Sequence, residues 1–306
     1  MITARSFPTP DIVKTTNNPA LWDQLGGFAQ VQAAEANAAL ELLDERLEEA
    51  EGLEERTAAF EAAYRHVAEW RYQVAAQGRW TRPYSDVEAF RAPIPAGEWR
   101  GYRLTPNAAD DLEPGSPASV LLTELEQVAK DRLMNGSNLH NPVNLPGGRT
   151  ITGNLLDQGL HPGQVITQTA RFADRQQLRQ ASFEILADLE TQRAGKDRPN
   201  ARDPELRQKF TDAAYCLIQG AEMQRGSDSI MRTFLVAAHT RVFDAAPVLP
   251  QAIDLDGMVR GQEGFSRVMR DQLRVLPPAD EFGRTAAVSG RAPRMSAVRR
   301  DGEITR

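Results

Sequence analysis

The chain has 306 residues and a formal net charge of −6, with 41% hydrophobic and 25% charged residues. This length holds one large domain or two modest ones, and the composition is typical of a soluble globular protein. The acidic balance excludes a general attraction to nucleic acid or anionic lipid, and a single cysteine, Cys216, excludes an internal disulfide and a thiolate zinc site.

The cellular location follows from the absence of apolar segments in the sequence. No stretch is long or apolar enough for membrane insertion, and the first residues lack the apolar core of a signal peptide. We therefore expect a cytoplasmic protein, either in the cell that makes it or in a recipient or host cell into which it is secreted.

The N-terminal part is predicted to be a leader followed by a helical hairpin. Residues 1–18 are rich in Thr, Pro and Asn and offer little to bury, so we expect a flexible leader. Residues 19–77 predict two helices, about 19–50 and 54–76, because apolar residues recur at helical spacing in both. The short join at Gly52 predicts an antiparallel pair.

Residues 78–118 are rich in Pro, Gly, Trp and Tyr and lack a long helical period. We interpret them as a connection that packs over the core or as a partner-binding surface. Their aromatic side chains would suit base stacking, but an acidic chain without a clustered basic stripe argues against nucleic acid as a partner.

Residues 119–283 are predicted to be a helical core domain, and 284–306, which are basic with little apolar matter, a disordered tail. Inside the core the sequence predicts helices at 119–133, 173–192 and 257–273, a polar loop at 135–148 and a β-hairpin at 149–172. The predicted fold class is mainly α: a helical bundle with a small β-hairpin flap and an N-terminal helical hairpin.

The most informative stretch is 203–242, where two helices with apolar faces flank a polar break. In the break, Gly226 can adopt a positive φ, and Ser227, Asp228 and Ser229 are good N-cap residues. Free N–H groups and the positive end of the helix dipole would meet there, near arginines, which favours an anion. A capped corner whose arginines pair with surface carboxylates is the alternative interpretation.

The order of a hairpin, a helix, and two helices around a Gly-containing turn resembles the core of Fic-like (Fido) proteins, a superfamily that includes AvrB-type effectors. In this family a His-Pro-Phe-x-Asp/Glu-Gly-Asn-Gly-Arg motif joins the central helices. Its His is the base, its acid holds magnesium, and its glycines and arginine bind nucleotide phosphates. With Gly226 on the first motif glycine, Arg225 stands at the acidic position, Ala221 at the His and Ser229 at the first Arg. Arg232 falls on a second arginine that many members carry.

This resemblance covers roughly residues 119–275 and implies a degenerate, AvrB-like effector or toxin. Such a protein would bind ATP or UTP with Mg²⁺ and act on a protein target, by nucleotidyl or phosphoryl transfer or as a pseudoenzyme. The implied catalytic residues are Asp228 and Arg232. The phosphate- or nucleotide-binding residues would be Arg225, Gly226, Ser227, Ser229 and Arg232, and the partner-binding flap residues Gly163, Gln164, Val165 and Arg171.

No metal ligand is assigned in this sequence. Metal hydrolases and Ser/His/Asp hydrolases are disfavoured, since there is no His-x-x-x-His pairing and no Gly-x-Ser-x-Gly elbow after a strand. The alternative function is a non-enzymatic helical protein-interaction module that uses residues 19–77 and the aromatic connection as its surface.

Overall fold

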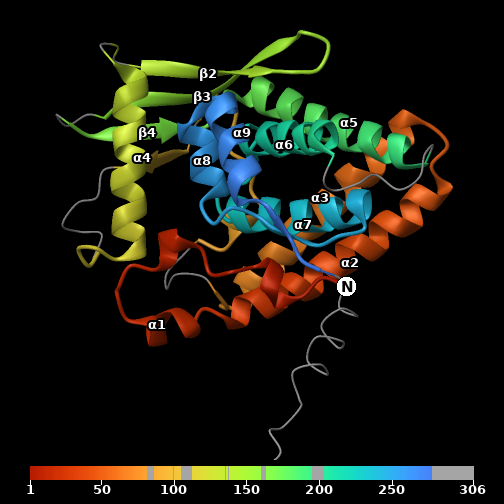
Figure 1. Cartoon of the computed structure of the whole chain (residues 1–306), viewed down its shortest axis with the longest axis horizontal. Coiled ribbons are helices and arrows are strands. Elements are labelled where there is room, and N and C mark those ends of the chain that lie inside the picture. The colour runs from red at the N-terminus through yellow and green to blue at the C-terminus, as the bar shows by residue number, and fades with distance from the viewer. Residues whose placement is uncertain are drawn as a thin grey trace, which may run out of the picture. The chain divides into compact units, whose positions relative to one another are not determined.

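Two long antiparallel helices, α2 (Gly27–Glu49) and α3 (Leu53–Ala76), form the N-terminal hairpin of the computed structural model (Figure 1). The structure describes residues 1–80, 86–98, 100–104, 112–134, 136, 138–159, 163–194 and 203–277. A short helix, α1 (Pro19–Asp23), precedes the pair. The Glu55 carboxylate accepts hydrogen bonds from the backbone N–H groups of Glu51 and Gly52, which fixes the start of α3.

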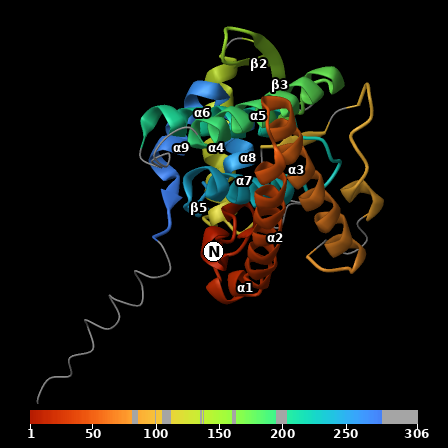
Figure 2. The same cartoon turned by 90° about the vertical axis from the view of Figure 1, so that its right-hand side faces the viewer.

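The hairpin shares one hydrophobic core with the central helices α5 (Phe172–Ala194), α6 (Pro204–Gln219) and α7 (Ser227–Phe243). Helix α2 packs against α7, and α3 packs against α5 and α7, as Figures 1 and 2 show from two sides. The hairpin is therefore part of the bundle. The mainly helical fold class predicted from the sequence is confirmed.

A small antiparallel sheet lies beside the bundle, with the strand order β1-β4-β3-β2. Its strands are β1 (Gly101–Arg103), β2 (Asn138–Asn144), β3 (Thr150–Gln158) and β4 (Val165–Gln168). The predicted hairpin at 149–172 is confirmed as β3 and β4. The predicted loop at 135–148 is wrong in its centre, because β2 pairs with β3 there and buries Asn141 and Val143.

The sheet packs on α4 (Pro117–Leu133) and α8 (Ile253–Val259) around a second cluster of buried apolar side chains. Helix α9 (Gly261–Gln272) follows α8 directly. The sequence predicts one helix at 257–273, but Gly261 adopts a φ of 68° and separates two. A short ladder of β5 (Pro247–Val248) and β6 (Arg274–Val275) closes the described chain.

The first eighteen residues differ from the flexible leader that the sequence predicts. They contain two 3₁₀ turns, Ala4–Ser6 and Asp11–Val13, and they bury Ile2 and Phe7 in the main core. The backbone of Ile2 exchanges two hydrogen bonds with the side chain of Asn37 on α2. Two apolar anchors and one polar clamp thus fix a segment whose average composition suggests disorder.

The compact part of the chain ends at Leu276. Residues Met1–Leu276 form one compact unit, and Pro277–Arg306 are divided from it. The predicted disordered tail, 284–306, lies outside the described residues. In the described part of the chain, no helix combines the length and the apolar character that crossing a membrane requires.

Candidate functional site

The predicted turn between the two central helices is the best-defined feature of the site. Gly226 has a φ of 78°, as its place in the sequence predicts. The expected capping by Ser227, Asp228 or Ser229 is wrong, since Gly226 itself is the N-cap of α7 and no side chain caps the helix. A Cβ atom at this position would lie 2.9 Å from the ring of Phe90, so packing requires glycine as well. The connection holds the turn from outside: the N–H of Arg225 donates to the carbonyl of Ala89, and the N–H of Gln224 donates to that of Ala92.

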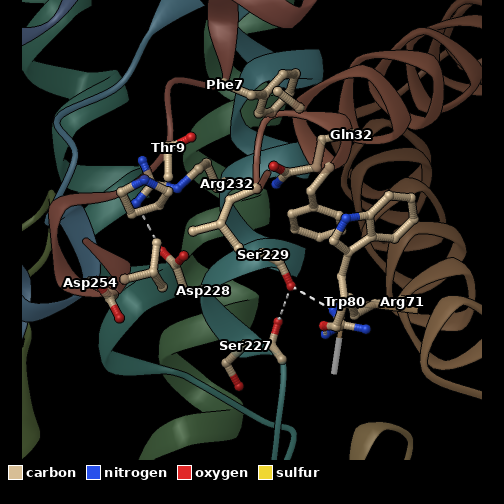
Figure 3. Close-up of a pocket in the computed structure, with 16 residues that line it drawn as sticks. Phe7, Thr9, Gln32, Arg71, Trp80, Ser227, Asp228, Ser229, Arg232 and Asp254 are labelled. Carbon is tan, nitrogen blue, oxygen red and sulfur yellow. Dashed lines mark hydrogen bonds and ion pairs between the residues drawn. The ribbon is translucent and has the colours of Figure 1, made fainter. Parts of the chain in front are cut away.

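The turn opens onto a cavity of about 730 Å³ (Figure 3). Of the predicted site residues, this cavity brings together Gly226, Ser227, Asp228, Ser229 and Arg232. Its other walls come from the N-terminal segment, α2 and the end of α3, and they are mainly apolar: Phe7, Pro10, Val13, Leu25, Phe28 and Trp80. An apolar cavity with a few convergent polar groups is the usual form of a small-molecule site.

Arg232, which the resemblance assigns to phosphate, is already occupied by protein groups. Its side chain is only 2% exposed. Nη1 donates to the carbonyl of Pro250 at 2.9 Å, and Nη2 donates to Gln251 O at 2.9 Å and to Asp228 Oδ1 at 3.0 Å. The guanidinium therefore ties the loop before α8 to the first turn of α7, and its charge is balanced by Asp228.

Arg225 does not join the other predicted residues. Its side chain is exposed, and it does not line the cavity. Ser227 lines the cavity, but its hydroxyl donates to the carbonyl of Met223 at 3.0 Å. Ser229 is better placed, since Figure 3 shows it between Arg232 on one side of the cavity and Arg71 on the other.

Arg71 of α3 is a site residue that the sequence analysis missed. It is 6% exposed, and its Nε donates to Ser229 Oγ at 3.0 Å while Nη2 donates to the carbonyl of Trp80 at 3.0 Å. Its guanidinium carbon lies 4.3 Å from the ring centre of Phe90 and 5.7 Å from that of Phe28. Nη1 is buried without a hydrogen-bond partner, and no carboxylate of the described residues pairs with this side chain.

Burial lowers the pKa of Arg71 from its ordinary value of 12.5 to about 10. The charged form is thus less favoured here than in water, because the site lacks a compensating anion. The sequence carries a signal for this residue: Arg71 lies between Val67 and Val74 on the buried stripe of α3, where a charge is unexpected.

Asp254 at the start of α8 is a second residue that the sequence analysis missed. It lines the same cavity as Asp228 and Arg232. Burial, together with the nearby negative charge of Asp228, raises the pKa of Asp254 from 3.8 to about 7, although Arg232 opposes this shift. A carboxyl group with such a pKa can accept or release a proton near neutral pH.

Asp254→Asn is expected to raise the free energy of unfolding at pH 8 by about 1–3 kcal/mol, because it removes a carboxylate whose charge is poorly compensated. The folded protein holds the Asp254 proton more tightly than the unfolded chain does. The stability that the folded protein gains by binding this proton is therefore fully present below pH 3.8, and it is lost as the pH rises through about 7. Urea unfolding at pH 4 and pH 8 should show a gain for Asp254→Asn at pH 8 only.

Asp271→Asn provides the control for that comparison, since Asp271 is 67% exposed and faces solvent. It should leave the free energy of unfolding within about 0.5 kcal/mol at both pH values. An equal effect of Asp254→Asn at pH 4 and pH 8 would mean that its pKa is not raised in the folded protein.

The predicted flap has a different environment from the one that the resemblance implies. Val165 is 2% exposed and belongs to β4, which pairs with β1 on one side and β3 on the other. A partner strand therefore cannot add to β4, because both of its edges are used. Gly163, with a φ of 77°, and Gln164 lie in the turn before β4. Arg171 lines a separate cavity of about 430 Å³.

The histidine and the cysteine of the central helices, His239 and Cys216, belong to the core. His239 lies between the rings of Phe210 and Phe243, and burial lowers its pKa to about 4. Cys216 is a buried free thiol, and burial raises its pKa to about 12, which is typical of a structural cysteine. Neither residue lines the cavity at the turn.

Among the described residues, no three His, Cys, Asp or Glu side chains are grouped so that they could hold a metal ion by themselves. Asp228 and Asp254 are the only carboxylates of the described chain that line the cavity. Two carboxylates can hold Mg²⁺ when phosphate oxygens and water complete its coordination.

No protein-family model matches the sequence, and a search of curated proteins also found no match.

Proposed function

We propose that the protein binds a nucleotide, or another small molecule with a phosphate group, in the cavity above the N-terminus of α7. The observation that carries this proposal is that the turn Gly226–Arg232 forms part of a mainly apolar cavity of about 730 Å³. A helix N-terminus offers free N–H groups and a positive dipole end to a phosphate. The apolar walls offer a surface for the body of the ligand.

The aromatic side chains of the cavity support a nucleoside as that body. Phe28 and Trp80 lie 5.4 Å apart between ring centres and both line the cavity. A nucleobase gains about 1–3 kcal/mol by stacking on such rings. Thr9 and Gln32 are polar groups on the same walls that can hydrogen-bond to a base or a sugar.

The proposal extends to group transfer onto a protein target. A hydroxyl oxygen of the target would attack a phosphorus atom of the bound nucleotide, and the bond from that phosphorus to its phosphate leaving group would break. Asp254 is the candidate acceptor of the hydroxyl proton, since its pKa of about 7 suits a general base. It would take the role of the motif histidine, whose position holds Ala221.

Calorimetric titration of ATP, ADP, UTP and AMP, each with and without Mg²⁺, tests the binding proposal. We expect at least one of these ligands to bind the native protein and to lose most of its affinity for Ala29→Trp. Ala29 lies on α2 and lines the cavity, so an indole there fills the space for a ligand. The matched control is Ala76→Trp on the exposed end of α3, which should bind like the native protein.

Failure of every ligand to bind the native protein would overturn the proposal. Equal binding by Ala29→Trp and the native protein would place the ligand elsewhere. A thermal melt of both variants shows whether each is folded before it is titrated.

The second candidate is a helical protein-interaction module. Exposed apolar side chains favour it: Val13 in the N-terminal segment, Leu21 on α1 and Leu25 in the turn after α1 are 46%, 44% and 37% exposed. Apolar residues that are grouped on a surface often mark a contact with another protein. Leu21→Lys in the full chain should abolish capture of a protein target but leave nucleotide binding unchanged.

A further inference from the structure

We infer that the anionic group of the ligand binds at the first turn of α7 in front of Arg71, and that it is a single phosphomonoester or carboxylate and not a polyphosphate. This inference rests on the binding part of the proposed function and narrows the ligand to one class: a nucleoside monophosphate or a comparable aromatic carboxylate. Such a ligand has no phosphate leaving group, so the inference keeps the binding site and replaces group transfer with binding alone. It also makes α3 of the N-terminal hairpin part of the binding site.

Arg71 carries a buried charge that no carboxylate of the described residues compensates. This side chain is more than nine-tenths buried, and its buried Nη1 has no partner. The aromatic rings of Phe28 and Phe90 and the carbonyl of Trp80 stabilise the guanidinium only in part. Burying a charge without a counterion is costly, and a bound anion would remove that cost.

The start of α7 supplies further hydrogen-bond donors to the cavity that Arg71 lines. The N–H groups of Ser227, Asp228 and Ser229 form the first turn of α7, and within the described part of the chain they have no hydrogen-bond acceptor. Arg71 Nε donates to Ser229 Oγ, while the Ser229 hydroxyl donates to the carbonyl of Gly226 at 2.9 Å. If this hydroxyl turns to the ligand, Ser229 links the anion to the guanidinium.

The charges that line the cavity limit how much negative charge a ligand can bring. The charged residues of the described chain that line it are Arg71, Arg232, Asp228 and Asp254. Asp228 neutralises Arg232 at 3.0 Å. Arg71 is therefore the single cation without a carboxylate partner, and Asp254 can add only negative charge. A carboxylate matches this balance, and a phosphomonoester with its one to two negative charges comes close to it, whereas a triphosphate brings more negative charge than the cavity offsets.

The part of the cavity away from the charged residues is apolar. Phe28, Trp80, Leu25 and Val13 form apolar walls around the rest of the cavity. A free phosphate ion would leave this surface exposed to water, so the affinity for inorganic phosphate should be much lower than for a nucleoside monophosphate.

The test is calorimetric titration of AMP, UMP, ATP and inorganic phosphate into the native protein, Arg71→Met, Arg71→Lys and Arg225→Met, in the absence of Mg²⁺. We expect AMP or UMP to bind the native protein at least about 10-fold more tightly than ATP or inorganic phosphate. Arg71→Met should weaken this binding by roughly 10- to 100-fold, since charged hydrogen-bond partners contribute that much. Arg225 is an exposed arginine of the same turn, so Arg225→Met should bind normally.

A thermal melt without ligand separates a binding role of Arg71 from a purely structural one. If Arg71 serves the ligand, Arg71→Met should melt at the native temperature or above it, because a buried charge without a counterion is removed. A lower melting temperature with unchanged monophosphate affinity would overturn the inference. If Arg71→Met does not fold, Arg71→Lys, which keeps the charge but loses the planar fork, must still lose affinity.

The two proposals fail in different ways. Tight binding of ATP alone, lost in Ala29→Trp but retained in Arg71→Met, would keep the proposed function and overturn this inference. No binding by any of these ligands would overturn both.

Discussion

Arg232→Glu is expected to lower the free energy of unfolding by about 3–5 kcal/mol, the cost of breaking a buried ion pair and leaving its partners without compensation. The guanidinium is 2% exposed and donates to two backbone carbonyls and to Asp228. A glutamate in its place would put a second carboxylate beside Asp228 and would leave the carbonyls of Pro250 and Gln251 without their donor. Urea unfolding followed by circular dichroism measures the loss.

Arg225→Glu is the matched control, since it makes the same charge reversal on the exposed side of the same turn. We expect it to change the free energy of unfolding by less than about 0.5 kcal/mol. Native-like stability of Arg232→Glu would contradict the anchoring role of this side chain. The expected loss also means that charge reversal at Arg232 cannot separate ligand binding from folding, so Arg71 and Ala29 are better positions for binding studies.

The turn itself could be predicted from the sequence because its chemistry is local. A glycine that needs a positive φ, followed by an apolar stripe, indicates where α7 begins, although Gly226 itself is the N-cap and no side chain caps this helix. The caps of α6 were predictable for the same reason: Asp203 accepts hydrogen bonds from the N–H groups of Glu205 and Leu206. Such patterns depend only on residues a few positions apart.

The rest of the site could not be predicted in this way, because its residues meet only after folding. Arg71 is 158 positions from Ser229, yet the two side chains share a hydrogen bond. Asp254 reaches the cavity from α8, and the N-terminal segment supplies a wall. The unusual position of Arg71 on an apolar helix stripe is a sequence signal, but it does not say which cavity the charge faces.

The same limit explains the errors in the predicted fold. The polar composition of residues 138–144 predicts a loop, because single-sequence patterns expect alternating apolar residues in a strand. In the structure the side chain of Asn141 is buried, and its Nδ2 donates to distant partners on β3 and α8, while its Oδ1 has no partner among the described residues. A strand with a polar core residue is visible only when those partners are known.

Asn154→Leu is the second prediction with a large expected effect, because it breaks the buried polar network that joins the sheet to α8. Asn154 Nδ2 donates to Thr167 Oγ1 and to the carbonyl of Met258, and its Oδ1 accepts from Asn141 Nδ2 at 2.6 Å. Its backbone N–H donates to Gln219 Oε1 on α6 at 2.7 Å. All the residues of this network whose side chains take part are at most 1% exposed: Asn141, Asn154, Thr167 and Gln219. Water therefore cannot replace the lost partners.

We expect Asn154→Leu to lower the free energy of unfolding by about 2–4 kcal/mol, since each buried polar group left without a partner costs about 1–3 kcal/mol and Met258 keeps its bond from Asn141. Gln158→Leu on the exposed end of the same strand is the control and should cost less than about 1 kcal/mol. Urea unfolding of the two variants measures the free energy of unfolding that each one loses. Equal, small effects would mean that the network is not needed to hold α8 against the sheet.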